Sequence, residues 1–200
     1  MAAAPTLRHP IGLSHTEREG YLLVRRLKCT ECHAYTDPVT GDPHAHLRRA
    51  AGLSVWGQVD AGHQCPISMT YAAVPALRVD PELAARFEPL LATTVYDPSF
   101  AAPETKAGLT AGMSMTEKQG GSDVRANTTH ATEQADGTYR LTGHKWFTSA
   151  PMSDILLTLA QAPGGLTCFV VPRVLPDGTT NRVALQRLKD KLGNRSNASS

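Results

Sequence analysis

The segment Gly112–Val124 holds the residues whose types and spacing best suit ligand chemistry. The adjacent glycines Gly120-Gly121 let the backbone come close to a bulky ligand and expose N–H groups that can hold phosphate oxygens. Ser122 follows with a hydroxyl, and Met113–Thr116 alternates thioether and hydroxyl side chains. In a strand that alternation makes one face apolar, which suits a planar, partly apolar heterocycle. The alternative is an ordinary glycine loop in which Ser122-Asp123 caps a turn or a helix.

A second run, Gly143–Ser149, combines adjacent aromatic residues with two hydroxyls. Its residue types indicate a strand. An aromatic ring and a hydroxyl from this strand could line the same ligand site as the glycine loop. The alternative is a hairpin strand that places Trp146 or Phe147 in the core.

The cysteines and histidines near the N-terminus need a separate interpretation. Cys29-Thr-Glu-Cys32-His33 matches the C-x-x-C-H pattern of haem attachment, and His44 and His46 could complete a zinc set. A single C-x-x-C supplies only half of a structural zinc site, and the N-terminus shows no export signal for haem attachment. We therefore predict no metal and no haem. Cys65 and Cys168 are expected to be small buried hydrophobic residues.

The composition indicates a globular protein. The 200 residues are 41% hydrophobic and 19% charged, with a net charge of +2. This charge is too small to indicate nucleic acid or a membrane surface as a partner. The longest apolar runs, Ile155–Leu159 and Thr167–Val171, are shorter than the roughly 18 residues of a membrane span. With no secretory signal, we expect a cytoplasmic protein with reduced thiols.

The elements that must position these residues fall into two groups. Helical patterns occupy 46–61 and 69–77, and a third helix begins at Asp80-Pro81-Glu82, with Asp80 as its N-cap. Short runs typical of strands occupy 128–132, 139–142, 146–149, 155–161 and 166–172, and Asp136-Gly137 marks a hairpin. The pattern predicts an α+β protein, in which a helical region precedes a small antiparallel β-barrel or sandwich. We expect an unassigned segment at 1–43, a helical region at 44–107 and a β domain at 108–200.

Several strings together resemble the acyl-CoA dehydrogenase superfamily, and most closely its AidB branch. They are Met115–Val124, Asp136–Lys145, Gly143–Phe147 and Leu188–Ser199, and Cys65–Thr70 resembles the helical region of that branch. The strings agree in order and spacing over about residues 58–200. Lys118 stands where the wider family commonly has proline, which supports the AidB branch.

The resemblance implies which residues contact a flavin. Met113–Thr116 would lie along the flavin, and Thr116 would bond its pyrimidine edge. Gly121 and Ser122 would face the pyrophosphate and the substrate channel. Phe147 would shield the cofactor, and Ser149 would lie near flavin N5. The implied cofactor-binding residues are Met113, Met115, Thr116, Gly121, Ser122, Phe147, Thr148 and Ser149.

The resemblance also implies an architecture and a function. The family has an N-terminal helical domain, a middle β domain and a C-terminal helical bundle, with FAD between the last two. In that family the catalytic glutamate lies in the bundle, and we expect this chain to stop before it. We therefore assign no catalytic residue here, and we do not assign the role of the catalytic glutamate to Glu117. We expect the FAD-binding fragment of an oxidoreductase acting on CH–CH groups of acyl-CoA-like thioesters. In the full-length protein we expect a homotetramer that contacts DNA only through its C-terminal part.

Two alternatives stay open at this point. One is a flavin-containing, DNA-associated protein of the adaptive response to alkylation, with little dehydrogenase activity. The other is a β-domain remnant that no longer binds FAD.

Overall fold

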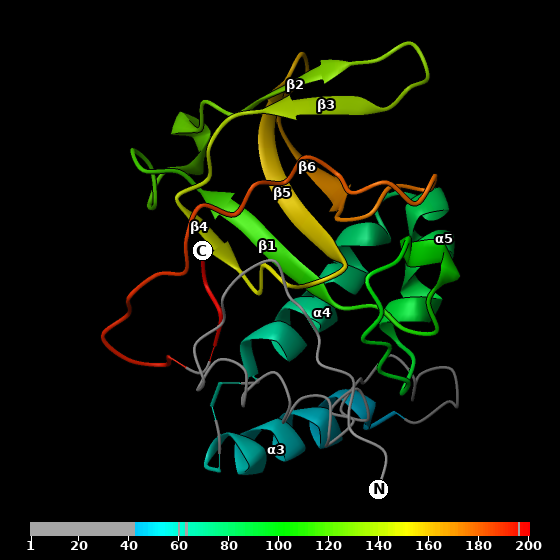
Figure 1. The fold of residues 1–200 in the computed structure, drawn as a ribbon. Coiled ribbons are helices and arrows are strands. Elements are labelled where there is room, and N and C mark those ends of the chain that lie inside the picture. The colour runs from blue at the N-terminus through cyan, green and yellow to red at the C-terminus, as the bar shows by residue number, and fades with distance from the viewer. Residues whose placement is uncertain (1–42, 60, 63, 196) are drawn as a thin grey trace, which may run out of the picture.

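A computed structural model describes residues 43–59, 61–62, 64–195 and 197–200 (Figure 1). In this part of the chain, helices come first and strands follow. The α-helices are α3 (Ala45–Gly57), α4 (Gln64–Leu77) and α5 (Pro81–Leu91), and two short 3-10 helices, η2 (Pro103–Thr105) and η3 (Val124–Ala126), lie before β1 and between β1 and β2. The strands are β1 (Ala111–Thr116), β2 (His130–Glu133), β3 (Tyr139–Thr142), β4 (Phe147–Ser149), β5 (Ile155–Ala162) and β6 (Gly165–Pro172). None of the described helices has the length and apolar character needed to cross a membrane.

Local signals explain where the helices begin and how they attach to the sheet. Asp80 caps α5 as predicted, because its carboxylate accepts hydrogen bonds from the N–H groups of Glu82 (3.0 Å) and Leu83 (3.1 Å). In α4, the Thr70 hydroxyl donates to the Pro66 carbonyl (2.8 Å) and accepts from the Ala111 N–H (3.0 Å). This hydroxyl therefore joins α4 to the first residue of β1.

Strand β5 is the centre of the sheet. It pairs antiparallel with β6 along its whole length, and parallel with β1 over residues 155–158 and with β2 at Gln161. Strand β4 pairs antiparallel with the outer side of β1, and β2 and β3 form a hairpin around Asp136-Gly137. Since β6 occupies one edge of β5, the strands β1 and β2 share the other edge.

The α+β class with helices before strands is confirmed, but the sheet differs in detail from an antiparallel barrel or sandwich. It is mixed, with two parallel pairs, and its strand order β3-β2-β5-β1-β4 does not close. The parallel strand β5 is buried on both faces over most of its length, as parallel strands commonly are. Pairing direction between strands far apart in sequence depends on the tertiary fold, which short apolar runs do not reveal.

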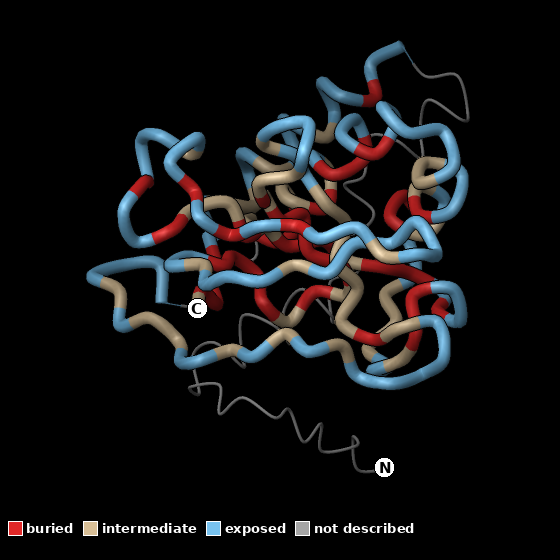
Figure 2. Tube along the Cα trace, turned by 90° about the horizontal axis from the view of Figure 1, so that it is seen from above, coloured by how far each residue is buried: buried red, intermediate tan, exposed pale blue. Residues whose placement is uncertain are grey.

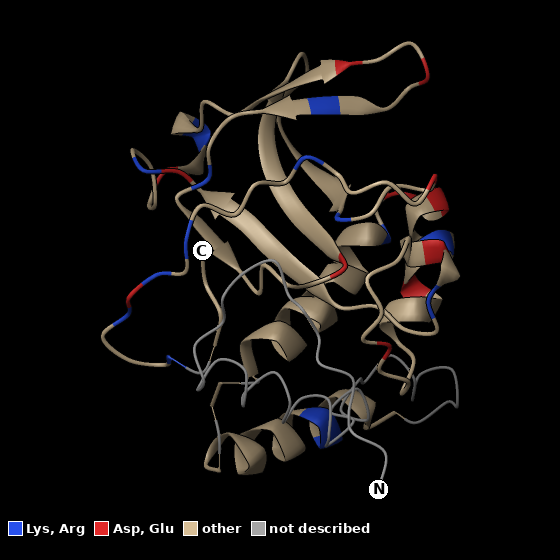
Figure 3. Cartoon of the chain, viewed as in Figure 1, with Lys and Arg blue, Asp and Glu red and all other residues tan. Residues whose placement is uncertain are grey.

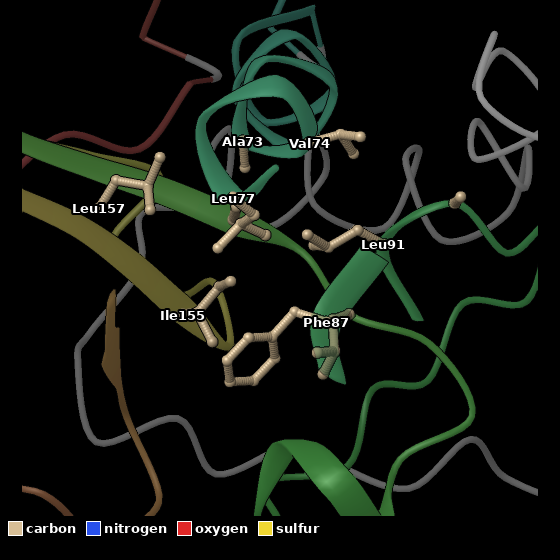
Figure 4. Close-up of a cluster of buried hydrophobic side chains, with 10 residues drawn as sticks. Ala73, Val74, Leu77, Phe87, Leu91, Ile155 and Leu157 are labelled. Carbon is tan, nitrogen blue, oxygen red and sulfur yellow. The ribbon is translucent and has the colours of Figure 1, made fainter. Parts of the chain in front are cut away.

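The hydrophobic core lies where α4 and α5 pack on one face of the sheet (Figure 4). Ala73, Val74 and Leu77 of α4 meet Phe87 and Leu91 of α5. The sheet contributes Leu109, Ala111, Ile155 and Leu157 from the β1 and β5 region, while Met113 and Met115 pack against the margin of the cluster. Buried residues accordingly concentrate between the helices and the sheet, and exposed residues lie at the periphery (Figure 2).

Candidate functional site

The pairing of β1 with β4 brings residues from both predicted runs together. Met113 lies opposite Ser149, Ser114 opposite Thr148, and Thr116 opposite Phe147. The register shifts between Ser114 and Thr116, so Met115 is the extra residue of a bulge.

The bulge changes which side chains share a face. Paired residues in a sheet lie on the same face, and residues two apart in one strand also do. Met113, Thr116, Phe147 and Ser149 therefore share one face of the sheet. The predicted separation of thioethers from hydroxyls does not continue to the end of β1, because the bulge moves Thr116 to the face of Met113.

Thr148 lies on the opposite face, where both its side chain and its backbone form hydrogen bonds within the protein. Its hydroxyl is 2.8 Å from the Ser114 hydroxyl, and both side chains are buried. Its N–H donates to the Ser200 carbonyl (2.7 Å), and its carbonyl accepts from the Ser200 N–H (2.9 Å). The C-terminal residues thus extend the sheet beyond β4 (Figure 1).

Glu117, directly after β1, accepts hydrogen bonds from several residues of the loop and of the neighbouring strands. Its side chain is 1% exposed and its carboxylate accepts a hydrogen bond from the Lys145 ammonium at 2.8 Å. The same carboxylate accepts from the N–H groups of Thr128 (2.7 Å) and Thr129 (2.9 Å) and from the amide of Gln119 (2.7 Å).

These contacts set the charge of Glu117. Burial alone would raise the pKa of this carboxyl, but the hydrogen bonds from Lys145, Thr129 and Thr128 outweigh it and hold the pKa well below its ordinary value. A carboxylate that stays ionised, buried and saturated with donors is a poor general base. Its surroundings indicate that it organises the loop.

The two adjacent glycines have different environments. Gly120 is buried, and a Cβ there would lie 2.6 Å from the Asp123 carbonyl oxygen. Gly121 is exposed, and a Cβ there would meet only Thr116 Cγ2, at 3.6 Å. The loop therefore closes tightly at Gly120, whereas Gly121 and the exposed Ser122 face solvent.

Two aromatic side chains are exposed beside this loop. Trp146 is 41% exposed and Phe147 is 37% exposed, and the backbone N–H of Trp146 donates to the Thr116 carbonyl at 2.9 Å. The Lys189 ammonium lies 4.1 Å from the centroid of the Trp146 ring and 5.4 Å from that of Phe147. The Lys118 ammonium lies 5.7 Å from the Trp146 centroid.

The structure thus brings Met113, Thr116, Phe147 and Ser149 to one face, with Gly121 and Ser122 in the loop that follows β1. Met115 lies at the bulge with its carbonyl bonded to the Asn127 amide (2.8 Å), and Thr148 points to the other face. Sequence reasoning missed the roles of Lys145, Asn127 and Lys189. A lysine in the Gly-x-Lys string and a glutamate in the loop were visible, but nothing local showed that they pair.

The remaining cysteine and histidine predictions have different outcomes. Cys29, Cys32 and His33 lie outside the described residues. His46 Nδ1 is 2.7 Å from the Tyr71 hydroxyl in the contact between α3 and α4. Cys65 is half-buried, and the expectation that Cys168 is buried is wrong, because its side chain is exposed on β6. In an antiparallel edge strand, alternate residues face away from the core.

Comparison with known families matches two segments of the chain. The family described as "Adaptive response protein AidB N-terminal domain" matches residues 24–98. The family described as "Acyl-CoA dehydrogenase, middle domain" matches residues 112–200. The second match contains the whole β1–β4 face and the glycine loop.

Individual proteins are similar over most of the chain. AidB of Escherichia coli K12 is 51% identical over 183 residues, which cover 90% of this chain and 33% of AidB. The apo-form structure of Bd2924 superimposes with a TM-score of 0.72 at 32% identity, covering 93% of this chain and 37% of that one. The Caenorhabditis elegans ACDH-11 structure in complex with C11-CoA has a TM-score of 0.57 at 34% identity, with 68% and 24% covered. The chain spans about a third of the length of the curated relatives that it matches.

Proposed function

Because the chain belongs to the acyl-CoA dehydrogenase superfamily, in its AidB-like branch, we propose that it forms the β-domain side of an FAD site. The observation that carries this proposal is the β1 bulge, which gathers Met113, Thr116, Phe147 and Ser149 on one face. For the whole protein we propose an oxidoreductase that acts on the CH–CH bond of acyl-CoA-like thioesters.

The residues present fit a flavin dinucleotide. A planar ring system needs an apolar surface with a few polar groups at its edge. The exposed ring of Phe147 offers that surface, next to Met113, which is partly buried against the core cluster. The hydroxyl of Thr116 and the buried hydroxyl of Ser149 offer the polar groups. The exposed backbone at Gly121 and Ser122 offers N–H groups for phosphate oxygens.

Each residue then has a defined task. Thr116 would hold the pyrimidine edge of the ring system, and Ser149 would donate a hydrogen bond close to N5. Phe147 would cover the ring and exclude water. Met115 and Thr148 support these contacts indirectly, because the bulge at Met115 sets the register and Thr148 anchors β4 to Ser114.

The bound flavin supplies a hydride acceptor, and that redox chemistry belongs to the cofactor. The chain's own contribution is to bind and orient it. Glu117 takes no part as a base, since its carboxylate is buried and paired with Lys145. The base that removes the substrate proton must come from residues outside this site.

The test is retention of flavin by the purified chain. The chain is mixed with excess FAD, freed of unbound FAD by gel filtration, and examined by visible absorbance, with circular dichroism as the control for folding. We expect a retained flavin spectrum in a folded sample. A folded chain that retains no flavin and shows no saturable quenching of FAD fluorescence contradicts the proposal.

A further inference from the structure

The bulge in β1 has a hydrogen-bond partner that comes from outside the sheet ladder. The extra residue of a β-bulge is left out of the regular pairing, so its backbone groups must find partners elsewhere. The carbonyl of Met115 accepts a hydrogen bond from the side-chain amide of Asn127 at 2.8 Å, across 12 residues of sequence. Asn127 follows η3 and precedes β2. Its side chain therefore takes the place of a strand partner where the ladder is interrupted.

The backbone of Asn127 is fixed before its side chain reaches the bulge. Strand β1 pairs with β5 over residues 155–158, and β2 pairs with the same edge at Gln161. The carbonyl of Asn127 accepts a hydrogen bond from the side-chain amide of Gln161 at 3.1 Å. The Asn127 N–H donates to the Val124 carbonyl at 3.1 Å, which closes η3. Asn127 thus connects β5 with the end of β1 at the point where β1 and β2 separate.

The burial of Asn127 shows that its amide serves as a donor. The residue is 4% exposed, and its Oδ1 atom has no hydrogen-bond partner among the residues that the structure describes. A buried acceptor without a partner lowers stability, and an apolar side chain of similar size would avoid this penalty. General stability of the core therefore does not explain the amide, whereas the bond from its Nδ2 atom to Met115 does.

The sequences of β1 and β4 allow two pairings. In a regular ladder that continues from Ser114 opposite Thr148, Met115 would lie opposite Phe147, and Thr116 would turn to the other face. In the structure, Thr116 lies opposite Phe147 and Met115 is left out. The Asn127 amide favours this second pairing, because it holds the carbonyl of the residue that is left out.

Charged side chains do not choose between the two pairings. Strands β1, β4 and β5 carry no Lys, Arg, Asp or Glu (Figure 3). The ion pair of Glu117 with Lys145 joins the ends of β1 and β4, but a lysine reaches its partner on a flexible four-carbon stem, which accommodates a shift of one residue. The side chain of Asn127 is short and meets one backbone atom, so its bond depends on the register.

We infer that Asn127 is a positioning residue for the flavin face: its side-chain amide holds the bulge that turns Thr116, and not Met115, toward the ligand. The inference rests on the proposed function, because that function gives the Thr116 hydroxyl its place at the edge of the flavin ring. Asn127 is itself buried and acts through the backbone of β1.

The experiment compares variants of the whole chain. Asn127→Ala removes the amide, and Asn127→Asp keeps its shape but replaces the donor with an acceptor. Each is studied alone, and Asn127→Ala is also combined with Thr116→Ala. The matched control is Gln134→Ala, which removes an amide that donates to the Thr132 carbonyl at 2.9 Å in the hairpin of β2 and β3. Fluorescence titration gives the FAD affinity, nuclear Overhauser contacts of Phe147 give the register, and circular dichroism with urea unfolding gives the folding and stability.

We expect Asn127→Ala to weaken FAD about fivefold, as Thr116→Ala does, which is the effect of losing one neutral hydrogen bond. Asn127→Asp should weaken FAD at least as much. The double variant should be no weaker than either single variant, because Asn127 acts through Thr116. In both Asn127 variants, the contacts of Phe147 should move from Thr116 to Met115. Gln134→Ala should change neither the affinity nor the register.

Three results overturn the inference. The first is an unchanged register in both Asn127 variants, even where the urea midpoint or the FAD affinity falls. The second is an unchanged FAD affinity in variants whose register has shifted. The third is a pair of affinity losses that multiply in the double variant, since independent residues behave in this way.

The register measurement needs no ligand, so it separates this inference from the proposed function. A parent chain that binds FAD, with a register that does not depend on Asn127, supports the FAD site and overturns the inference. A folded parent chain that binds no FAD, but whose register depends on Asn127, contradicts the FAD site and supports the role of Asn127 in the bulge. A folded chain without either property contradicts both.

Discussion

The carboxylate of Glu117 and the ammonium group of Lys145 form a buried ion pair of 2.8 Å across 28 residues of sequence. Glu117 begins the loop after β1, and Lys145 lies just before β4. The pair therefore joins the two strands whose side chains form the candidate flavin face. It keeps the loop and the exposed aromatic residues in one arrangement.

Removing Glu117 should destabilise the chain strongly. Glu117→Ala leaves the Lys145 ammonium, the buried Thr129 N–H and the partly buried Thr128 N–H without their acceptor, for which we expect a loss of about 3–5 kcal/mol in the free energy of unfolding. Urea unfolding followed by circular dichroism measures it. Glu133→Ala, at an exposed strand position, is the matched control and should stay within about 0.5 kcal/mol. Equal losses in the two variants would disprove the role of the ion pair.

The free energy of unfolding should decrease as the pH is lowered, and this decrease should depend on Glu117. The pKa of this carboxyl is lowered in the folded chain from its ordinary value of 4.5. Its contribution is therefore fully present above pH 4.5 and declines as the pH falls below that value, because the unfolded chain takes up the proton first. Urea midpoints measured from neutral to acidic pH should decline less steeply in Glu117→Gln than in the parent chain. Parallel curves for the two proteins would contradict this assignment.

Substitutions of Ser149 and Thr148, the two neighbouring hydroxyl residues of β4, should differ in their effect on FAD affinity. Ser149→Ala removes the donor that we place near flavin N5, so FAD affinity should fall severalfold. Because this buried side chain also hydrogen-bonds Cys65, stability should fall by about 1 kcal/mol as well. Thr148→Val removes the bond to Ser114 on the opposite face, so stability should fall by about 1 kcal/mol while FAD affinity is retained. Fluorescence titration and urea unfolding of both variants check this. The reverse assignment of effects would show that the flavin lies on the other face.

The adjacent glycines should also respond differently to alanine. Gly120→Ala places a Cβ 2.6 Å from the Asp123 carbonyl, so the loop must shift and the chain should lose more than about 1 kcal/mol. Gly121→Ala meets only ordinary contact, so stability should hold, while the added methyl group hinders a ligand close to the backbone. Thermal melts and FAD titrations distinguish the two. Normal FAD affinity in Gly121→Ala would exclude close approach of the ligand at this position.

The sequence was sufficient for the elements and for most of their bounds. The Asp80 cap, the Asp136-Gly137 turn and the β-branched runs are local signals, and each acts within a few residues of where it stands. The strings Met115–Val124 and Gly143–Phe147 were also sufficient to identify the family, because a family resemblance depends on residue order and spacing.

Tertiary structure decided what these elements do together. Four features join segments that are far apart in the sequence. They are the parallel pairing of β5 with β1 and β2, the bulge at Met115, the burial of Glu117 against Lys145, and the approach of Lys118 and Lys189 to the ring of Trp146. The residues' periodicity could not reveal them, because alternation along a strand says which side chains share a face only until a bulge shifts the register. Contacts between distant segments form only when the whole chain packs, so their geometry belongs to the fold and not to any one motif.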